Sequence, residues 1–307
     1  MMISEMERKK YIDVIRYGHK TTVGVLNEGD QIVIQEKIDG ANASFMFDEK
    51  SRKIRAFSRN TELDEENTLG GFYQWTQQLN PSELCIGGIY FGEWLNPHKV
   101  KYANYEKQFF LFDIYNTYTN EYVDFPIVQE EAERLVLNLV PVFYQGEYKG
   151  YEHLKSFVGK TLLGGRLGDL ETGEGIVVKN IDYKDKFGKQ VFVKLVTDSF
   201  REVQKQKAPK DPNQLKTPEM LFIEQYVTQG RVEKFLYKLV DEGILDEKFG
   251  IEEMGVVLKN LNVRIYEDLL KEESDYLPKE YEEKVLRKSL GRLLPTLVKK
   301  ILLSDVA

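Results

Sequence analysis

The stretch that decides the fold lies near the start of the chain, where residues 31–48 read QIVIQEKIDGANASFMFD. Two runs rich in β-branched and aromatic residues, QIVIQEK and NASFMFD, flank a short polar segment around Asp39 and Gly40. Asp followed by Gly is typical of turns, so the pattern predicts two neighbouring strands with a tight connection. Lys37 then falls at the end of the first strand.

The same strand pattern continues to about residue 125 and returns after residue 174. Further runs of this kind are KIRAFS, CIGGIYFGEW, QFFLFDIY, GIVVKN (175–180) and QVFVKLV (190–196). Apolar residues follow a helical spacing at 4–17, with Ser4 as the N-cap, at 127–139 and at 151–158. We therefore expect an α+β fold, in which residues 1–205 form a domain of antiparallel sheets with flanking helices.

The composition changes after residue 200. Residues 201–216, REVQKQKAPKDPNQLK, contain two prolines and five basic residues against two acidic ones. We interpret 206–216 as a basic, proline-containing linker. From 217 to 307 the strand signal is lost and apolar residues recur every three to four positions, which predicts a small all-α C-terminal domain.

Composition excludes several classes of protein. The chain has 307 residues, a formal net charge of −7 and one cysteine, Cys85, so an intramolecular disulfide and a cysteine-cluster zinc site are excluded. The N-terminal MMISEMERKK carries charges where a signal peptide needs an apolar core. We expect a monomer in the cytoplasm (the host cytoplasm if the chain is phage-encoded), with no membrane partner. The acidic balance lowers the expectation of a general nucleic-acid coat.

Lys37 is the candidate nucleophile. A lysine that attacks must be neutral, and its ordinary pKa of about 10.4 would have to fall by roughly 3 units. Desolvation or neighbouring cations can lower the pKa of a lysine in this way. The alternative is a surface lysine before a β-turn, because K-x-D-G alone occurs by chance in a few per cent of chains of this length.

Four further motifs follow in order. They are FGEW with Glu93, QFFLFDIY with Phe112 and Asp113, EGIVVK with Glu174 and Lys179, and VFVKLV with Lys194. Together with EKIDG they resemble the motifs of the covalent nucleotidyltransferase superfamily, which comprises nucleic-acid ligases and mRNA capping enzymes that carry a nucleotide on a lysine. Five motifs in this order are far more specific than any one of them.

Most of the chain resembles the RNA ligase 2 family of ATP-dependent, double-strand-specific RNA ligases. EKIDGANAS is similar to that family's EKI-x-G-x-N-x-S segment, with Lys37, Gly40, Asn42 and Ser44 at the matching positions. The stretch FGEWLNPHKVKYANYEKQFFLFDI resembles its linked third motifs, and YVTQGRVEKFLYKL resembles its helical C-terminal domain. Related DNA ligases and capping enzymes carry an OB fold there, which the helical periodicity after 217 disfavours.

The resemblance implies a role for each matching residue. Lys37 would attack the α-phosphate of ATP and carry AMP covalently, and Lys179 and Lys194 would neutralise the charge that develops there. Nucleotide contacts are implied for Glu36, Asn42, Arg59, Glu93, Phe112 and the three lysines. Glu174 would hold Mg²⁺ or Mn²⁺. Asn42, Arg59 and Arg231 would contact RNA. Ordinary alternatives stay open, namely a core aromatic for Phe112, a strand-end carboxylate for Glu93 and a solvated turn arginine for Arg59.

Two positions depart from the family pattern. Asp39 stands where the family has a basic or polar side chain, although it matches the wider K-x-D-G, and Val196 replaces the second lysine of K-x-K.

In the helical domain, Asp268 and Glu272 lie four residues apart and resemble a carboxylate pair of the family, with a solvated helix face as the alternative.

The resemblance thus predicts an ATP-dependent RNA ligase that adenylylates an RNA 5′-phosphate and seals it to a 3′-hydroxyl, at nicks in duplex RNA or an RNA/DNA hybrid. The alternatives are a DNA ligase or guanylyltransferase of the same superfamily, or a catalytically dead module that only binds RNA, which Val196 would favour. The net charge does not exclude RNA, because local lysines and the basic linker could supply a cationic groove.

Overall fold

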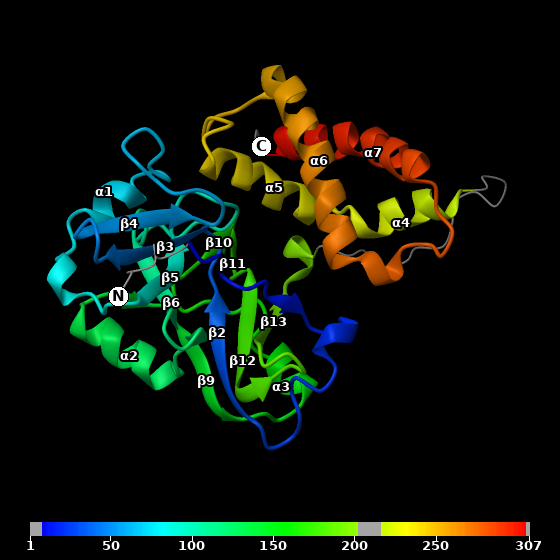
Figure 1. The fold of residues 1–307 in the computed structure, drawn as a ribbon. Coiled ribbons are helices and arrows are strands. Elements are labelled where there is room, and N and C mark those ends of the chain that lie inside the picture. The colour runs from blue at the N-terminus through cyan, green and yellow to red at the C-terminus, as the bar shows by residue number, and fades with distance from the viewer. Residues whose placement is uncertain (1–7, 202–215, 305–307) are drawn as a thin grey trace. The chain divides into compact units, whose positions relative to one another are not determined.

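The computed structural model describes residues 8–201 and 216–304 and divides the chain into two compact units, Met1–Thr197 and Asp198–Ala307 (Figure 1). The first unit is built of antiparallel sheets with helices, and the described part of the second contains helices and no strand, so the predicted α+β fold is confirmed. Residues 206–215 of the predicted linker lie outside the described residues, and the linker stays a prediction. None of the helices in the described ranges is both long and apolar enough to cross a membrane.

The first unit contains two large sheets and a small hairpin. The strand order is β1-β13-β12-β2-β9 in the five-stranded sheet and β4-β3-β5-β6-β7 in the other, where β8 pairs with β6. Only the β1–β13 and β6–β8 pairs are parallel among the described strands. The strands are β1 (Ile15–Arg16), β2 (Gln31–Lys37), β3 (Ala41–Asp48), β4 (Lys53–Ser58), β5 (Gly88–Trp94), β6 (Phe109–Asn116), β7 (Glu121–Tyr122), β8 (Asn138–Leu139), β9 (Val142–Glu147), β10 (Arg166–Leu167), β11 (Leu170–Glu171), β12 (Gly175–Lys184) and β13 (Gln190–Val196).

Burial on both faces explains why strands such as β2 and β3 read as continuous apolar runs. One core lies against the six-stranded sheet and includes Phe45, Tyr90 and Trp94 together with residues of α1 (Phe72–Thr76) and α2 (Phe125–Arg134). A second core packs α3 (Tyr151–Lys155) against β2, β12 and β13. A third, aromatic core joins β3, β5 and β6 to β13 of the other sheet.

Two predicted helices differ from the structure. Residues 8–14 are not helical, because the Tyr11 side chain is drawn into the aromatic core and Arg8 binds the backbone carbonyls of Arg59 and Asn60. The helix predicted at 127–139 is α2, which ends at Arg134, since Val136 has a positive φ of 54° and the chain then enters β8.

The second unit is helical as expected. Its helices are α4 (Pro218–Tyr226), α5 (Gln229–Asp241), α6 (Met254–Glu272) and α7 (Glu283–Ser304), and short 3-10 turns lie at 198–200, 251–253 and 274–276. Thr217 and Thr228 accept hydrogen bonds from backbone N–H groups and so cap α4 and α5. Apolar residues of all four helices form a single core.

Candidate active site

Three lysines share one face of the five-stranded sheet. Lys37 of β2 pairs with Gly175 of β12, and Lys194 of β13 pairs with Val177 of β12. Lys179 follows Val177 by two positions. Because alternate residues of a strand face the same side, all three side chains lie on the face of Lys37. The predicted common face of Lys179 and Lys194 is therefore confirmed by the register.

The same register sets the three lysines at different levels. At about 3.3 Å per residue, Lys194 lies about 7 Å along the sheet from the level of Lys37, and Lys179 about 13 Å. Gly175 lies between the ends of β2 and β13 and admits no side chain, since a Cβ there would be 2.1 Å from the carbonyl oxygen of Leu195.

Lys37 is paired with the carboxylate of Glu174. Its ammonium group donates a 2.6 Å hydrogen bond to Oε2 of Glu174, the residue before β12. Burial lowers the pKa of Lys37, but the charges of Glu174, Glu93 and Asp39 outweigh burial, and the net pKa is raised. This corrects the expectation of a lowered pKa, because carboxylates rather than cations surround the amine. The described residues hold Lys37 as an ammonium ion.

Glu93 and Asn42 come from the other sheet. They are cross-strand partners, Glu93 near the C-terminal end of β5 and Asn42 near the N-terminal end of β3, which begins four residues after Lys37. Burial raises the pKa of Glu93 to about 8, although the positive charge of Lys37 acts in the opposite direction. Gly40 lets the two segments approach, since a Cβ there would lie 2.7 Å from the Trp94 carbonyl oxygen and 3.0 Å from Cγ of Glu93. The glycine of the motif thus serves a close approach of two chains.

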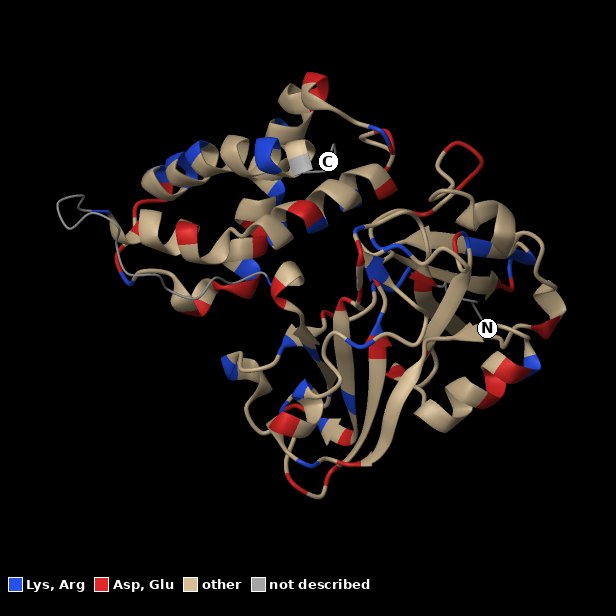
Figure 2. Cartoon of the chain, turned by 180° about the vertical axis from the view of Figure 1, so that it is seen from behind, with Lys and Arg blue, Asp and Glu red and all other residues tan. Residues whose placement is uncertain are grey.

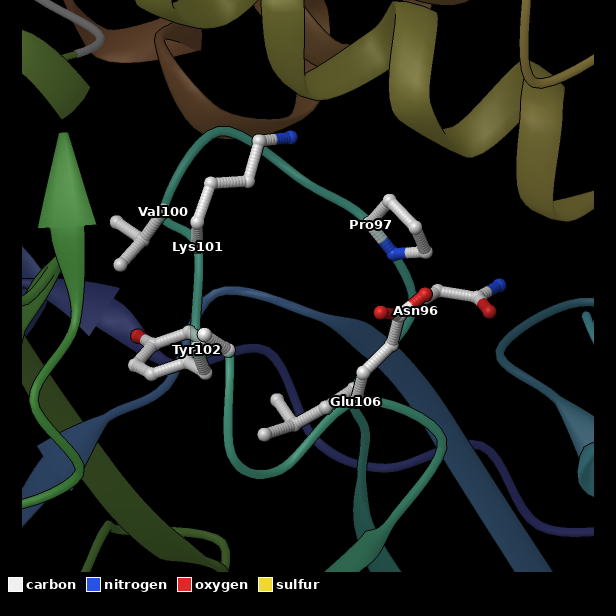
Figure 3. A pocket seen from close by; sticks show the side chains of 8 residues that line it. Asn96, Pro97, Val100, Lys101, Tyr102 and Glu106 are labelled. Carbon is white, nitrogen blue, oxygen red and sulfur yellow. The ribbon is translucent and has the colours of Figure 1, made fainter. Parts of the chain in front are cut away.

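Asp39 anchors the loop that follows β5. Its carboxylate accepts a 2.8 Å hydrogen bond from the N–H of Val100 and lies 3.4 Å from Nδ1 of His98. Burial acts to raise the pKa of Asp39, but the His98 and Val100 contacts hold it below the ordinary value. Tyr102 accepts a hydrogen bond from the Asp39 N–H. The same loop lines a small cavity of about 80 Å³, in which Tyr102 and Lys101 are seen (Figure 3).

Glu36 anchors a second loop. As the neighbour of Lys37 on β2, its side chain lies on the opposite face of the sheet. The carboxylate accepts 2.7 Å hydrogen bonds from the Thr161 hydroxyl and the Leu162 N–H. The side chain of Glu36 therefore contacts the 161–162 loop and is not part of the lysine face, and its expected nucleotide contact stays a prediction.

Lys179 has a structural partner that the sequence did not predict. Its ammonium group lies 2.7 Å from Oδ1 of Asp113 and donates a 2.8 Å hydrogen bond to the Phe112 carbonyl oxygen. Burial raises the pKa of Asp113 and lowers that of Lys179, against the mutual attraction of the pair. The amine is buried in this pair two positions beyond the level of Lys194, and its expected contact with an α-phosphate stays a prediction.

Tyr11 completes this buried network. Its hydroxyl donates a hydrogen bond to Oδ2 of Asp113, and its ring lies 4.7 Å from that of Phe112. Phe112 itself is half-buried on β6 and packs against the aromatic core. No role was predicted for Asp113, and Tyr11 was expected in a helix. The position of Asp113 beside Phe112 in a motif was the only signal for this network.

Lys194 and Val196 lie at the end of β13. Burial raises the pKa of Glu174, and the positive charges of Lys37 and Lys194 act in the opposite direction, so Lys194 lies within electrostatic reach of the Lys37–Glu174 pair. Val196 pairs with Gly175, so it lies on the lysine face at the level of Lys37. The substituted position of the last motif is thus inside the candidate site.

Arg59 and Arg231 are placed differently from each other. Arg59 is partly exposed and pairs with Asp13 at 2.5 Å, which leaves its predicted contacts untested. Arg231 is fully buried in the helical unit and pairs with Asp268 at 2.5 Å and Glu273 at 2.7 Å. The expected RNA contact of Arg231 is corrected, because its guanidinium group is enclosed with these two carboxylates.

The predicted pair Asp268 and Glu272 is divided between two environments. Asp268 belongs to the buried Arg231 pair, whereas Glu272 is partly exposed and lies 4.0 Å from Lys234. The buried ion pair between Arg231 and Asp268, which joins α5 to α6, therefore gives Asp268 a structural role.

A divalent cation has one candidate ligand here. Glu174 is a carboxylate at the edge of the lysine face, and such oxygen ligands suit Mg²⁺ and Mn²⁺. Within residues 8–201 and 216–304, no group of three or more His, Cys, Asp and Glu side chains could hold a metal. The donor set fits a cation that takes most of its ligands from a bound nucleotide and water, as Mg²⁺ commonly does.

The site thus combines three lysines on one sheet face with buried carboxylates and a partly buried aromatic ring, groups that are suited to contact with phosphate and with a planar ring. The family model "RNA ligase" matches residues 30–196, a range that covers more than half of the chain and contains every lysine of this face. The chain belongs to the RNA ligase family.

Solved structures give more distant similarities. The match to the structure of Naegleria gruberi RNA ligase with PPi has 18% sequence identity and a TM-score of 0.45. It covers 65% of this chain and 59% of the Naegleria chain. A mutant of that ligase with ATP and Mn is 17% identical, with 63% and 57% covered and a TM-score of 0.44. The chain thus spans less than two thirds of the length of these ligases. No curated protein matches it.

Proposed function

We propose that the chain is an ATP-dependent RNA ligase that works through a lysyl-AMP on Lys37. The observation that carries the proposal is the register that sets Lys37, Glu174 and Lys194 together inside a domain of the RNA ligase family. In the related Naegleria structures the ligands are ATP, AMP and Mn, which agrees with a nucleotide and a divalent cation as the partners of this site.

In the first step, the transfer of AMP from ATP to Lys37, each residue of the site has its own role. Lys37 gives up a proton to water and attacks the α-phosphorus of ATP, a P–N bond forms, and the P–O bond to the β-phosphate breaks as pyrophosphate leaves. Lys194 supplies positive charge near the phosphate as negative charge develops. Glu93 and Phe112 hold the nucleoside, through hydrogen bonds to the ribose and a stacking face for adenine. Glu174 is the carboxylate ligand for Mg²⁺ or Mn²⁺, which supplies charge neutralisation on the phosphates.

The next two steps transfer AMP to RNA and seal the strand. The RNA 5′-phosphate attacks the lysyl-AMP phosphorus and releases Lys37, and a 3′-hydroxyl then displaces AMP and forms the phosphodiester. Asn42 of β3 pairs with Glu93 of β5, and its proposed role is to help position the RNA end. A nick in duplex RNA presents both ends side by side, and such a nick is the substrate that we propose for a monomeric enzyme.

The experiment that tests this function follows the label of [α-³²P]ATP into the protein with Mg²⁺. We expect labelling of the wild type and none of Lys37→Ala, whereas Lys50→Ala, in an exposed turn, should label normally. [α-³²P]GTP in parallel tests for a guanylyltransferase. Nicked RNA, nicked DNA and hybrid duplexes then show which nick is sealed. Full labelling of Lys37→Ala, or RNA binding without any adduct, would contradict the proposal.

A further inference from the structure

The exposed face of α7 is strongly basic, although the whole protein is acidic. α7 contains six basic residues and one acidic residue, in a chain with a net charge of −7. Figure 2 shows Lys and Arg recurring along this helix. Five of the six make no ion pair with the described residues and are exposed: Lys284, Lys288, Arg292, Lys299 and Lys300. The sixth, Arg287, pairs with Glu283 at 2.8 Å.

Four of these cations lie on one side of the helix. At about 100° per residue, positions 284, 288, 292 and 299 fall within roughly a quarter of a turn of one another. The residues of α7 that enter the core of the helical unit are on the opposite side, and they are Leu286, Leu290, Leu294, Val298 and Ile301. The basic face therefore points away from the core, where it has no part in holding the helical unit together.

Unpaired cations on a rigid helix are suited to a polyanion. Lys284 and Lys299 are about 22 Å apart along the axis at 1.5 Å per residue. A nucleic-acid duplex carries on the order of ten phosphates over such a length. Like charges held this close cost free energy through repulsion, and binding of phosphates would offset that cost.

A membrane fits this face less well than a nucleic acid. Helices that bind in the plane of a membrane insert an apolar face, whereas the apolar face of α7 is buried, with Leu286, Leu294 and Val298 at 0% exposure. Leu303, at the end of the helix, is the only exposed large hydrophobic residue among its described side chains. The interactions of the face are thus limited to charge.

We propose that the basic face of α7, made by Lys284, Lys288, Arg292 and Lys299, binds the phosphate backbone of the RNA substrate away from the reacting ends. The proposal takes the class of nucleic acid from the proposed function and adds a second binding surface, on the helical unit. It separates two tasks, since the lysine face carries out the chemistry and α7 supplies affinity that does not depend on base sequence.

The test compares two triple variants with the same change of charge. One is Lys284→Gln/Lys288→Gln/Lys299→Gln, and the matched control is Lys50→Gln/Lys248→Gln/Lys259→Gln, at exposed lysines elsewhere. Binding of a fluorescein-labelled nicked RNA duplex is measured by anisotropy between 50 and 200 mM KCl. Each phosphate contact adds about 0.9 to the slope of log K against log salt. We expect the α7 variant to lose about 2 to 3 from the slope and to bind roughly tenfold more weakly.

Further measurements distinguish this proposal from its alternatives. Labelling of Lys37 by ATP alone should be unchanged in the α7 variant, and a protein that binds RNA through α7 but is never labelled would contradict only the proposed function. A Lys→Arg variant at the same three positions should bind like the wild type, which a loss through misfolding would not explain. Equal slopes for the two Gln variants, or loss of binding to phosphatidylserine vesicles without an effect on RNA, would overturn the proposal.

Discussion

The ammonium group of Lys37 donates a 2.6 Å hydrogen bond to the carboxylate of Glu174, although 137 residues separate the two in the chain. The pair exists because β2 and β12 are antiparallel neighbours, in which Lys37 ends one strand and Glu174 precedes the other. Each partner thereby fixes the position of the other at the edge of the lysine face.

Replacing Glu174 should impair the adenylation of Lys37. In Glu174→Gln the amide keeps the size of the side chain but loses the charge that orients the ammonium group and would hold a cation. We expect labelling by [α-³²P]ATP to slow by roughly 100-fold, because a charged contact at the reacting group is typically worth a few kcal/mol. Glu171→Gln, at an exposed carboxylate of β11, is the control. A wild-type rate for Glu174→Gln would exclude its role.

The buried carboxyl group of Glu93 should make stability depend on pH. Its pKa is raised from 4.5 to about 8 in the folded chain by burial, so the folded state keeps a proton that the unfolded state releases. Stability should therefore fall as the pH rises from about 4.5 to 8, by on the order of a few kcal/mol. Glu93→Gln removes this titration. Urea denaturation of the wild type and of Glu93→Gln at pH 5 and pH 8.5 measures this loss of stability. An equal change in the free energy of unfolding of the two proteins would contradict the prediction.

Breaking the Lys179–Asp113 pair from one side should destabilise the first unit. Both side chains are buried, with 7% and 4% exposure. Lys179→Met leaves Asp113 without its countercharge, a change that costs about 3–5 kcal/mol in buried pairs. Lys179→Met/Asp113→Leu removes both charges and should lose less than the sum of the single changes. Urea denaturation gives the double-mutant cycle, in which additive losses would show that the pair is not coupled.

Gly40 should not tolerate a side chain. A Cβ there would lie 2.7 Å from the carbonyl oxygen of Trp94, and the backbone must shift. We expect Gly40→Ala to cost about 1–3 kcal/mol and to slow adenylation by roughly 10- to 100-fold by displacing Glu93. The control is Gly255→Ala in α6, where no atom lies within 4 Å and alanine favours the helix by up to about 1 kcal/mol. Equal free energies of unfolding for the wild type and Gly40→Ala would show that the chain around Gly40 can shift without cost.

Arg231 should matter for the stability of the helical unit. Glu273 is 1% exposed, so Arg231→Met would leave a buried carboxylate unpaired, at a cost of about 3–5 kcal/mol. Arg287→Met removes an exposed pair of α7 and should cost about 1 kcal/mol or less. Thermal and urea denaturation compare the two. If Arg231→Met instead kept full stability and lost RNA affinity, the RNA contact expected from the sequence would be restored.

The sequence alone predicted the local elements, and its motifs supplied the candidate residues of the site. β-branched and aromatic runs predicted the strands around Lys37, Glu93, Phe112 and Lys194, and helical periodicity predicted α4 to α7. These features are local, since strand and helix patterns are written within ten to twenty residues. Alternation predicted a common face for Lys179 and Lys194 only if their strands pair, and the register of β12 and β13 supplied that pairing.

Only the tertiary structure decided the partners of these side chains. The level of Lys179 on the sheet follows from pairing register, and its burial with Asp113 and Tyr11 depends on segments about 70 and 170 residues away. The raised pKa of Lys37 and the enclosure of Arg231 arise in the same way from carboxylates brought in by distant strands and helices. Contacts between charged residues that are far apart in the chain produce no periodic pattern in the sequence. The environment of each charged group could therefore be seen only in the folded structure.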